Sequence, residues 1–315
     1  MRMCGKISFL MPGILLFSCA HRSGGIGRRA DVSSLGPNFE ARQLTHQHKT
    51  RDYLLYTPTK YNSTTELPLV IGFHGGRTSN VIFARTTLFH RLADEQGFLV
   101  AYPNGIEGNW NDGRGTANPD VDDVGLVTSL IENIKAVRNV DARRVYVTGI
   151  SNGGFMVQRL ACESTHLIAA FSSVAGSMGT ALKPKCDPSR PAAMMLIHSP
   201  EDKFVPWAGG EMKRGAGGDI LSVPELVEFW KQKNSCTAFK EEVVPDNGRQ
   251  DGTRVFVNRH GRCKDSSEVL FYKVEGGGHT WPGGEAQPAW LVGPTSTKIN
   301  ATKEIWSFFK AHSLP

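Results

Sequence analysis

Short apolar runs alternate with amphipathic segments along most of this chain. The runs predict strands that are buried on both faces. They lie at residues 69–73, 98–102, 144–148, 169–174 and 193–197. Apolar positions at helical spacing predict helices over residues 86–96, 126–137 and 153–162. Strands and helices that alternate in this way form a mainly parallel sheet with helices on both faces, so the pattern predicts the α/β class.

Weaker patterns extend this fold at both ends. Residues 51–57 and a short run near Gln43 predict an antiparallel strand pair before the parallel strands. Ser222 and Glu225 form the capping-box pattern of a helix start. The other expected elements are strands at 255–257 and 269–272 and a last helix capped by Asn300. No internal repeat or proline-rich linker divides the chain, so we expect residues 41–315 to form one domain.

The positive charge is concentrated at the N-terminal end. The 315 residues carry a formal net charge of +6, and residues 1–51, with eight Lys or Arg and two acids, account for all of it. The other 28 basic residues are balanced by 28 acidic ones. A nucleic-acid-binding protein needs excess positive charge on the folded surface that meets phosphate. The neutral body therefore argues against a nucleic-acid partner, and oligomeric state stays open.

The first residues have the pattern of an export signal. Arg2 and Lys6 precede the apolar run 7–17, which has the length of a signal-peptide core and is too short to span a bilayer. Residues 16–19 resemble a bacterial lipobox, which makes Cys19 a candidate for lipidation and membrane anchoring; plain secretion is the alternative. We expect a signal peptide over 1–19, a flexible Gly- and Ser-rich tether over 20–40, and a secreted, periplasmic or lipid-anchored protein.

The remaining cysteines agree with export. Apart from two in the leader, the chain has four: Cys162, Cys186, Cys236 and Cys263. The sequence contains no C-x-x-C spacing, which argues against a zinc or redox site, and we expect no metal and no cofactor. Pairing of sequence neighbours, Cys162 with Cys186 and Cys236 with Cys263, is the preferred framework. Two other connectivities and free buried thiols stay open.

The strongest chemical signal is a G-x-S-x-G motif at residues 149–153, between a predicted strand and a predicted helix. This context is that of the nucleophile elbow of the α/β-hydrolase fold. The turn is so sharp that glycines must flank the serine, whose hydroxyl then projects above the sheet. Ser151 is therefore the candidate nucleophile; a glycine-rich turn without catalysis is the alternative.

A serine hydroxyl needs a base that is oriented by an acid, and in this fold they follow in the order Ser, acid, His. His279 lies in a glycine-rich loop after the last predicted strand and is the preferred base over His166, His198, His260 and His312. Asp202 follows the predicted strand at 193–197 and is the preferred acid, with Glu201 as its neighbouring competitor.

Backbone amides complete the expected chemistry. The loop that follows the strand at 69–73 has the position of an oxyanion hole, with one amide expected from Gly76 or Arg77 and another from Asn152. His74, in the same loop, is expected to be structural.

Two tryptophans, two aspartates and one glycine-rich stretch are further candidates for a role at or near the site. Trp110 and Trp281 are candidate walls of a substrate pocket, with core filling as an equal alternative. Asp122 and Asp123 are expected to cap a helix or to accept buried hydrogen bonds rather than to bind metal. The stretch 203–221, with five glycines, is the longest irregular segment, and such loops often border a site.

Several motifs together resemble a known family. They are Arg-Asp-Tyr-Leu-Leu-Tyr at 51, Phe-His-Gly-Gly at 73, Trp-Asn-Asp-Gly-Arg at 110, Val-Asp-Asp-Val at 121, Gly-Ile-Ser-Asn-Gly-Gly at 149, Val-Pro-Trp at 205 and Gly-Gly-Gly-His-Thr-Trp-Pro-Gly at 276. The chain is similar to secreted bacterial esterases grouped with poly(3-hydroxybutyrate) depolymerases and feruloyl esterases. This resemblance implies a carboxylic ester hydrolase with Ser151, Asp202 and His279 as its triad.

Two residues depart from the family pattern. Relatives commonly have glycine where Ser199 stands, and they often have small residues where Arg77 stands. Neither departure removes a catalytic group. We expect hydrolysis of feruloyl, other aromatic or acetyl side-group esters of polysaccharides, on small or polymer-attached substrates. The alternatives are a polyhydroxyalkanoate depolymerase, a peptidase or acyltransferase on the same fold, and a non-catalytic surface-binding lipoprotein.

Overall fold

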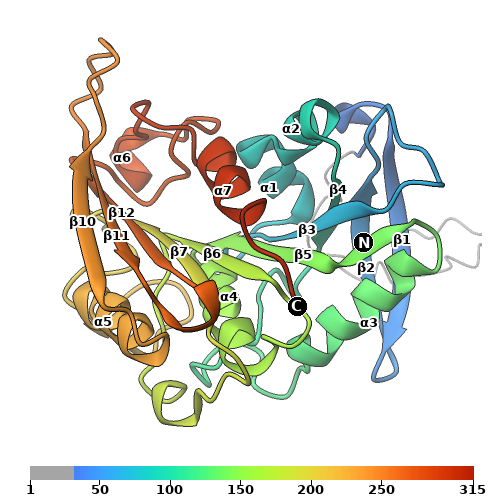
Figure 1. Ribbon diagram of the computed structural model, residues 1–315, viewed down its shortest axis with the longest axis horizontal. Coiled ribbons are helices and arrows are strands. Elements are labelled where there is room, and N and C mark those ends of the chain that lie inside the picture. Colours follow the sequence, from blue (N-terminus) through green and yellow to red (C-terminus); the bar gives the residue numbers. More distant parts are fainter. Residues whose placement is uncertain (1–31) are drawn as a thin grey trace, which may run out of the picture.

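One sheet of ten strands runs through the computed structural model, which describes residues 32–315 (Figure 1). The strand order is β1-β2-β4-β3-β5-β6-β7-β12-β11-β10. The strands are β1 (Phe39–His46), β2 (Lys49–Tyr56), β3 (Leu67–Phe73), β4 (Leu99–Pro103), β5 (Val140–Ile150), β6 (Ala170–Val174), β7 (Ala193–His198), β10 (Ala238–Val243), β11 (Arg254–Gly261) and β12 (Val269–Glu275). The six strands from β4 to β12 are parallel neighbours, and antiparallel pairs extend both edges.

Helices cover both faces of the sheet, as the alternating pattern predicted. The helices α3 (Asp123–Lys135), α4 (Asn152–Glu163) and α5 (Val223–Lys233) bury Leu130, Leu160 and Trp230 on one face. On the other face, α1 (Asn80–Thr87), α2 (Phe89–Gln96) and α7 (Ala301–Phe309) contribute to a second core (Figure 1). The shorter elements are β8 (Gly210–Glu211), β9 (Asp219–Ile220), α6 (Ala289–Val292) and three turns of 3-10 helix at Val32–Leu35, Lys183–Lys185 and Lys264–Ser266.

Two predicted boundaries are wrong. The helix expected over 86–96 is two helices, because Leu88 adopts left-handed dihedrals (φ 56°, ψ 26°) that end α1 and begin α2. The expected tether over 20–40 is partly folded: Val32 and Leu35, in a 3-10 turn, pack against the second core, and β1 begins at Phe39. The signal peptide and Cys19 lie outside the described residues. Within residues 32–315, no helix is both long and apolar enough to cross a membrane.

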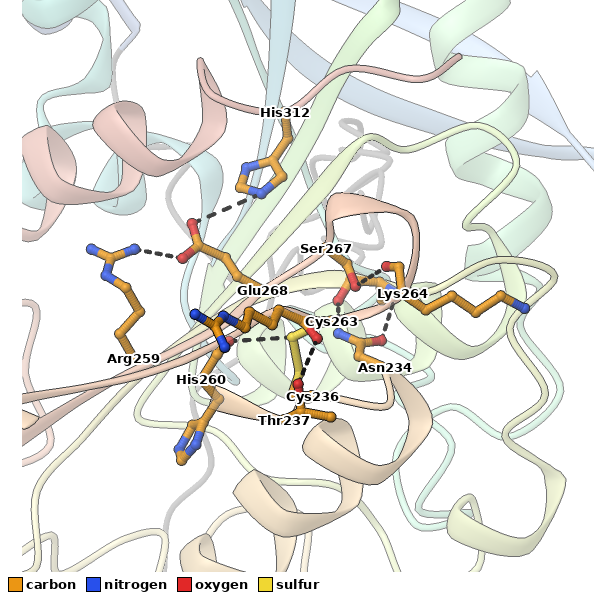
Figure 2. Close-up of a disulfide and its surroundings, with 12 residues drawn as sticks. Asn234, Cys236, Thr237, Arg259, His260, Cys263, Lys264, Ser267, Glu268 and His312 are labelled. Atoms are coloured by element: carbon orange, nitrogen blue, oxygen red, sulfur yellow. Dashed lines mark hydrogen bonds and ion pairs between the residues drawn. A yellow bond between two sulfur atoms is a disulfide. The ribbon is translucent and has the colours of Figure 1, made fainter. Parts of the chain in front are cut away.

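Both disulfides join sequence neighbours, which confirms the preferred framework. Cys162 near the end of α4 bonds to Cys186, and Cys236 just after α5 bonds to Cys263 in the turn between β11 and β12. Figure 2 shows the second bridge beside the turn that it holds. There the Lys264 amide also donates to the Asn234 carbonyl at 2.8 Å, so a covalent bond and a main-chain bond hold the antiparallel edge of the sheet to α5.

His74, directly after β3, is fully buried, and both ring nitrogens have partners. Nδ1 lies 2.7 Å from the Gly75 carbonyl oxygen, and Nε2 accepts the Gly105 amide at 3.0 Å. A carbonyl only accepts and an amide only donates, so Nδ1 carries the proton and the ring is neutral. Burial is the main reason why the pKa of His74 is lowered to about 4. This residue ties the end of β3 to the loop that follows β4, which fits the expected structural role.

We expect removal of the second bridge to destabilise the protein measurably. The variant Cys236→Ala/Cys263→Ala should lose about 3 kcal/mol of unfolding free energy, because the bridge closes a long loop in the unfolded chain. Urea unfolding of the oxidised proteins tests this. An unchanged midpoint with an unchanged slope would show that the bridge adds nothing to stability.

A second prediction concerns acid stability. Between pH 6.5 and about 4 the unfolded chain protonates His74 and the folded protein does not, so the stability that depends on a neutral His74 is complete above pH 6.5 and falls as the pH drops toward 4. The variant His74→Gln should be less stable than the wild type at pH 8. That deficit should shrink by about 3 kcal/mol by pH 4, as measured by urea unfolding. The exposed His166→Gln is the control, and a deficit that does not change with pH would contradict the prediction.

Candidate active site

Ser151 lies at the sharp turn between β5 and α4. Its dihedrals, φ 57° and ψ −124°, are strained for a residue that carries a side chain. A Cβ atom at Gly149 would lie 2.5 Å from the Gly153 carbonyl oxygen, and one at Gly153 would lie 2.2 Å from the Phe73 carbonyl oxygen. Glycine is therefore required on both sides of Ser151, because the helix starts too close to the strand ends for any side chain.

Asp202 and His279 meet because their strands are neighbours. Asp202 follows β7, His279 follows β12, and these strands pair in parallel. The His279 Nδ1 atom lies 2.8 Å from Asp202 Oδ2. The other carboxylate oxygen, Oδ1, accepts the amides of Phe204 at 2.7 Å and Val205 at 2.9 Å. The turn after β7 thus fixes the carboxylate, and the carboxylate fixes the ring.

Asp202 is ionised although it is buried. Burial is the largest influence and by itself would raise the pKa of the carboxyl group. The charge and hydrogen bond of His279, the nearby His198 ring and the Val205 amide together lower the pKa of Asp202 below its usual value. An ionised carboxylate accepts the Nδ1 proton of His279, which makes Nε2 the basic nitrogen of the ring.

The competing acid has a different role. Glu201 Oε2 accepts the Ser199 hydroxyl at 3.0 Å and the Gly276 amide at 2.9 Å. These bonds join the turn after β7 to the end of β12 and involve no contact with His279. His198 donates from Nδ1 to the Ser199 carbonyl at 3.0 Å and is buried, so it contacts backbone, as expected for a strand-end histidine.

Ser151 and His279 line the same cavity, which has a volume of about 540 Å³. No hydrogen bond joins the Ser151 hydroxyl to the His279 ring in the described part of the chain; such bonds are often long in unliganded active sites. The apolar lining includes Phe83, Phe155, Phe204, Met212, Leu291 and Val292. Phe204 also stacks on the His279 ring, with 4.9 Å between the centroids.

Two residues whose amides are candidates for the oxyanion hole line this cavity. Gly76 and Asn152 both line it, and Asn152 is the first residue of α4, where backbone amides have no intrahelical acceptor. The Arg77 amide donates to the Gly108 carbonyl at 2.7 Å. Of the two amides expected from the loop after β3, the Gly76 amide is therefore the one that has no acceptor within residues 32–315.

The Asn152 side chain is anchored to the segment that follows β4. Its Oδ1 accepts the Trp110 amide at 2.8 Å, and its Nδ2 donates to Asp112 Oδ2 at 2.6 Å. Asp112 is fully buried and also pairs with Arg114, at 2.7 Å between Oδ2 and Nη2. Arg114 in turn donates to the Gly217 carbonyl at 2.8 Å. A polar chain thus runs from the residue after Ser151 to the glycine-rich segment 203–221.

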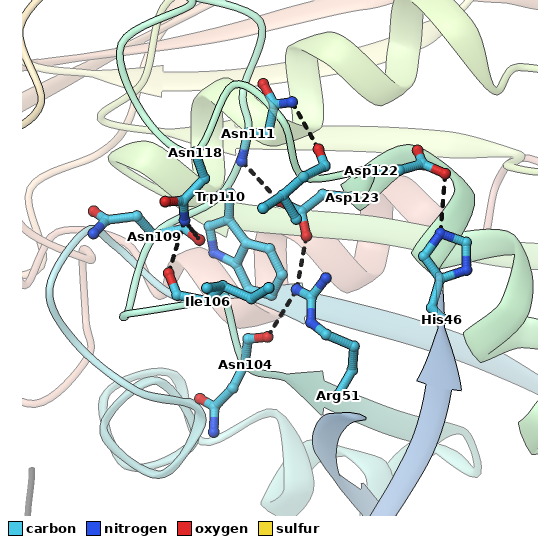
Figure 3. A network of polar contacts seen from close by, with 12 residues as sticks. His46, Arg51, Asn104, Ile106, Asn109, Trp110, Asn111, Asn118, Asp122 and Asp123 are labelled. Carbon is cyan, nitrogen blue, oxygen red and sulfur yellow. Dashed lines mark hydrogen bonds and ion pairs between the residues drawn. The ribbon is translucent and has the colours of Figure 1, made fainter. Parts of the chain in front are cut away.

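A second buried ion pair, between Arg51 and Asp123, also contacts the segment that follows β4 (Figure 3). Asp123 accepts Arg51 at 2.7 Å and the Asn111 amide at 2.7 Å. Asp122 caps α3 through the Gly125 amide at 2.8 Å. The prediction that these two carboxylates act as a cap and as a buried acceptor is confirmed. Within residues 32–315, no group of three His, Cys, Asp or Glu side chains is arranged to hold a metal ion.

Of the two alternatives for Trp110 and Trp281, core filling is the one the structure contains, and the prediction that they line the substrate pocket is wrong. Trp110 is fully buried, donates to the His74 carbonyl at 2.9 Å and packs edge-on against Phe73. Trp281 is 2% exposed and donates to the Thr302 hydroxyl at 3.0 Å. Neither lines the cavity, because each indole is turned inward by a hydrogen bond to the backbone or to a helix.

Sequence reasoning did not single out the side chains that line the pocket instead. Phe204, Met212 and residues 215–216 belong to the stretch 203–221, and this glycine-rich segment does border the cavity as expected. Phe155 lies four positions after Ser151 on α4, a spacing that places it on the same side of the helix. That spacing was the sequence signal available for Phe155, whereas no pattern in the sequence marked Met212 or Leu291 as pocket residues.

The chain is similar to a family model and to several curated esterases. Residues 51–183 match the family model described as esterase PHB depolymerase. The chain is 24% identical to feruloyl esterase B of Piromyces equi over 84% of this chain and 46% of that protein. It is 26% identical to "Probable feruloyl esterase C" of Aspergillus terreus over 94% of both. It is 26% identical to poly(3-hydroxyalkanoate) depolymerase C of Paucimonas lemoignei over 62% of this chain and 45% of that protein.

Solved structures share the fold. An acetyl xylan esterase from Aspergillus awamori superposes with a TM-score of 0.56 at 17% identity, over 85% of this chain and 98% of that one. A thermostable esterase superposes with a TM-score of 0.59 at 16% identity, over 89% of this chain and 64% of that one. The chain spans about half the length of two of the relatives named above. With the sheet and the elbow, these matches show that the chain has the fold of the esterases named here and that residues 51–183 are similar to the esterase PHB depolymerase family.

Proposed function

We propose that the protein hydrolyses carboxylic esters through a Ser151–His279–Asp202 triad and an acyl-enzyme. The observation that carries this proposal is that the strained Ser151 turn and the His279 ring, which Asp202 holds, line one cavity. The relatives and structural neighbours support the broader assignment as a serine ester hydrolase.

In the first half of the reaction, the Ser151 oxygen attacks the ester carbonyl carbon. His279 Nε2 takes the hydroxyl proton, and the Asp202 carboxylate stabilises the imidazolium that forms. Negative charge develops on the carbonyl oxygen, where the amides of Gly76 and Asn152 and the N-terminus of α4 stabilise it. The protonated His279 then donates its proton to the leaving alkoxide, and the alcohol departs.

In the second half, water takes the place of the alcohol. His279 Nε2 accepts a proton as the water oxygen attacks the acyl carbon, and the same amides stabilise the oxyanion. The proton returns to the Ser151 oxygen as the acyl bond breaks. The carboxylic acid leaves, and the neutral histidine is restored.

The lining of the cavity favours esters with an apolar acyl group or alcohol. Phe155, Phe204 and Met212 offer aromatic and polarizable surface beside Ser151. Feruloyl, other aromatic or acetyl side-group esters of polysaccharides are the leading substrate class. Hydroxyalkanoate polyesters are the second candidate, supported by the depolymerase relative. Values of kcat/KM on methyl ferulate, acetylated xylan and hydroxybutyrate oligomers rank these substrates directly.

The disulfides support an exported protein, since such bridges persist in oxidising compartments. Lipidation at Cys19 stays a prediction, because that residue lies outside the described part of the chain. Mass analysis of the mature protein tests it: a diacylglycerol adduct on an N-terminal Cys19 supports anchoring, and cleavage without lipid supports secretion.

Replacing the nucleophile tests the proposed reaction. We expect Ser151→Ala to lower kcat on p-nitrophenyl acetate by roughly six orders of magnitude and to lose labelling by a fluorophosphonate. The wild type should be labelled at Ser151. If the folded, oxidised wild type is not labelled, the serine mechanism is wrong. Cleavage of a peptide p-nitroanilide without cleavage of the acetate would favour a peptidase, and a biological role that survives in Ser151→Ala would favour a binding protein.

Two neighbouring acids provide a matched pair of variants. Asp202→Asn should lower kcat/KM by about 10⁴-fold, because the amide no longer holds the required His279 tautomer. Glu201→Gln should keep most of the activity, because its contacts are with the Ser199 hydroxyl and the Gly276 amide. Steady-state rates of both variants, with thermal unfolding as a folding check, test the assignment. The reverse ranking would make Glu201 the catalytic acid.

A further inference from the structure

The lining of the cavity around Ser151 and His279 contains arginines and no acidic residue. Arg77 and Arg114 are its charged members. Arg114 is buried and forms a bidentate ion pair with Asp112, at 3.0 and 2.7 Å to Oδ2, which neutralises its charge. The unbalanced charge of the lining therefore belongs to Arg77.

Arg77 has no partner for its side chain within residues 32–315. It is exposed, and the one hydrogen bond that it makes there comes from its backbone amide, to Gly108. Its φ of 59° is in the left-handed region, which glycine adopts without strain and arginine does not. The chain thus holds a long cationic residue at a strained position, directly after Gly76 and its proposed oxyanion amide.

A second cation, Arg214, does not line the cavity itself but packs on a residue that does, and it belongs to a different segment. The Arg214 guanidinium carbon is 5.1 Å from the centroid of the Phe204 ring, and Phe204 lines the cavity and stacks on His279. Arg214 is exposed and has no acidic partner among the described residues. Its neighbour Gly215 lines the cavity. Two arginines without ion pairs therefore come to one site from segments far apart in the sequence.

Nearby acids along the chain form no ion pair with these arginines within residues 32–315. Glu211 and Asp219 lie three and five positions from Arg214, but neither lines the cavity or pairs with it. Glu107 and Glu285 flank cavity segments, but neither lines the cavity and neither pairs with Arg77 or Arg214. A site with apolar walls and uncompensated cations attracts an anion, and arginine binds carboxylates with a geometry that lysine does not reproduce.

We propose that the preferred ester carries a free carboxylate, which Arg77 binds while the ester carbonyl occupies the site beside Ser151. Arg214 adds to the attraction from the Phe204 side. This inference rests on the proposed function and, within it, favours acidic esters over neutral feruloyl or acetyl esters of polysaccharides. Two kinds of acidic ester fit, the carboxylate-ended oligomers of a hydroxy acid and the monoesters of a dicarboxylic acid. These two sources place the carboxylate on the alcohol and on the acyl side of the ester, respectively.

Two matched substrate pairs test the proposal on the oxidised full-length protein. The dimer of 3-hydroxybutyrate is compared with its methyl ester, and phenyl hydrogen glutarate is compared with phenyl pentanoate. In at least one pair the charged member should have about a tenfold higher kcat/KM, mainly because its KM is lower. The preference should fall as ionic strength rises. The pair that shows it identifies the side of the ester that carries the carboxylate.

Substitutions then assign the preference to its residue. Arg77→Gln should bring the charged-to-neutral ratio of kcat/KM close to one, Arg77→Lys should restore part of it, and Arg214→Gln should reduce it. Arg91→Gln, at an exposed site on α2, is the control and should leave the ratio unchanged. Thermal unfolding of each variant shows that the fold is kept.

Two results would overturn the inference. One is a wild-type ratio near one in both pairs, and the other is a ratio that Arg77→Gln does not change. The proposed function fails by a different result, namely hydrolysis of the neutral esters by Ser151→Ala. An enzyme that hydrolyses neutral esters through Ser151 and ignores the carboxylate would keep the esterase assignment and remove only this proposal.

Discussion

The close approach of α4 to the ends of β3 and β5 is the constraint on which the rest of the site depends. Because the Gly153 backbone lies against the Phe73 carbonyl, the chain must turn within a few residues, and Ser151 is left in dihedrals that it would not adopt alone. The strain is sustained by the buried parallel strands on either side. The same approach brings the first amides of α4 beside the loop after β3, so that one packing contact places both the serine and the amides.

The other parts of the site are fixed by the order of strands. Asp202 and His279 are 77 positions apart, yet they meet because β7 and β12 are neighbours in the sheet. The polar chain from Asn152 through Asp112 to Arg114 fixes the loops around the cavity in a similar way. Its members are buried and bonded to one another, and an unpaired charge among them would be costly. The loops around the cavity are thus held by ion pairs, and its base is held by the sheet.

Sequence reasoning succeeded where a local pattern determines structure and failed where distant contacts do. The buried strands, the elbow glycines, the Ser222 capping box and the sequence-local disulfides all follow from short-range chemistry, and the structure contains them. Strand β10 has no such pattern, because five of its six residues are exposed at the sheet edge and no alternation marks it. The break at Leu88 left no signal, because it is a leucine and not a glycine that adopts the left-handed conformation.

The tryptophans show a further limit. A loop sequence does not tell whether an indole faces a ligand or the core. Here the orientation depends on hydrogen bonds to His74 and Thr302, which are distant in the chain.

The disulfides have a consequence for how the protein is made. Their partners are 24 and 27 positions apart and the two loops do not overlap. A chain that enters an oxidising compartment from its N-terminus can close the Cys162–Cys186 bridge before Cys236 arrives. Among these four cysteines, pairing in the order of emergence yields the native bridges without any exchange of partners.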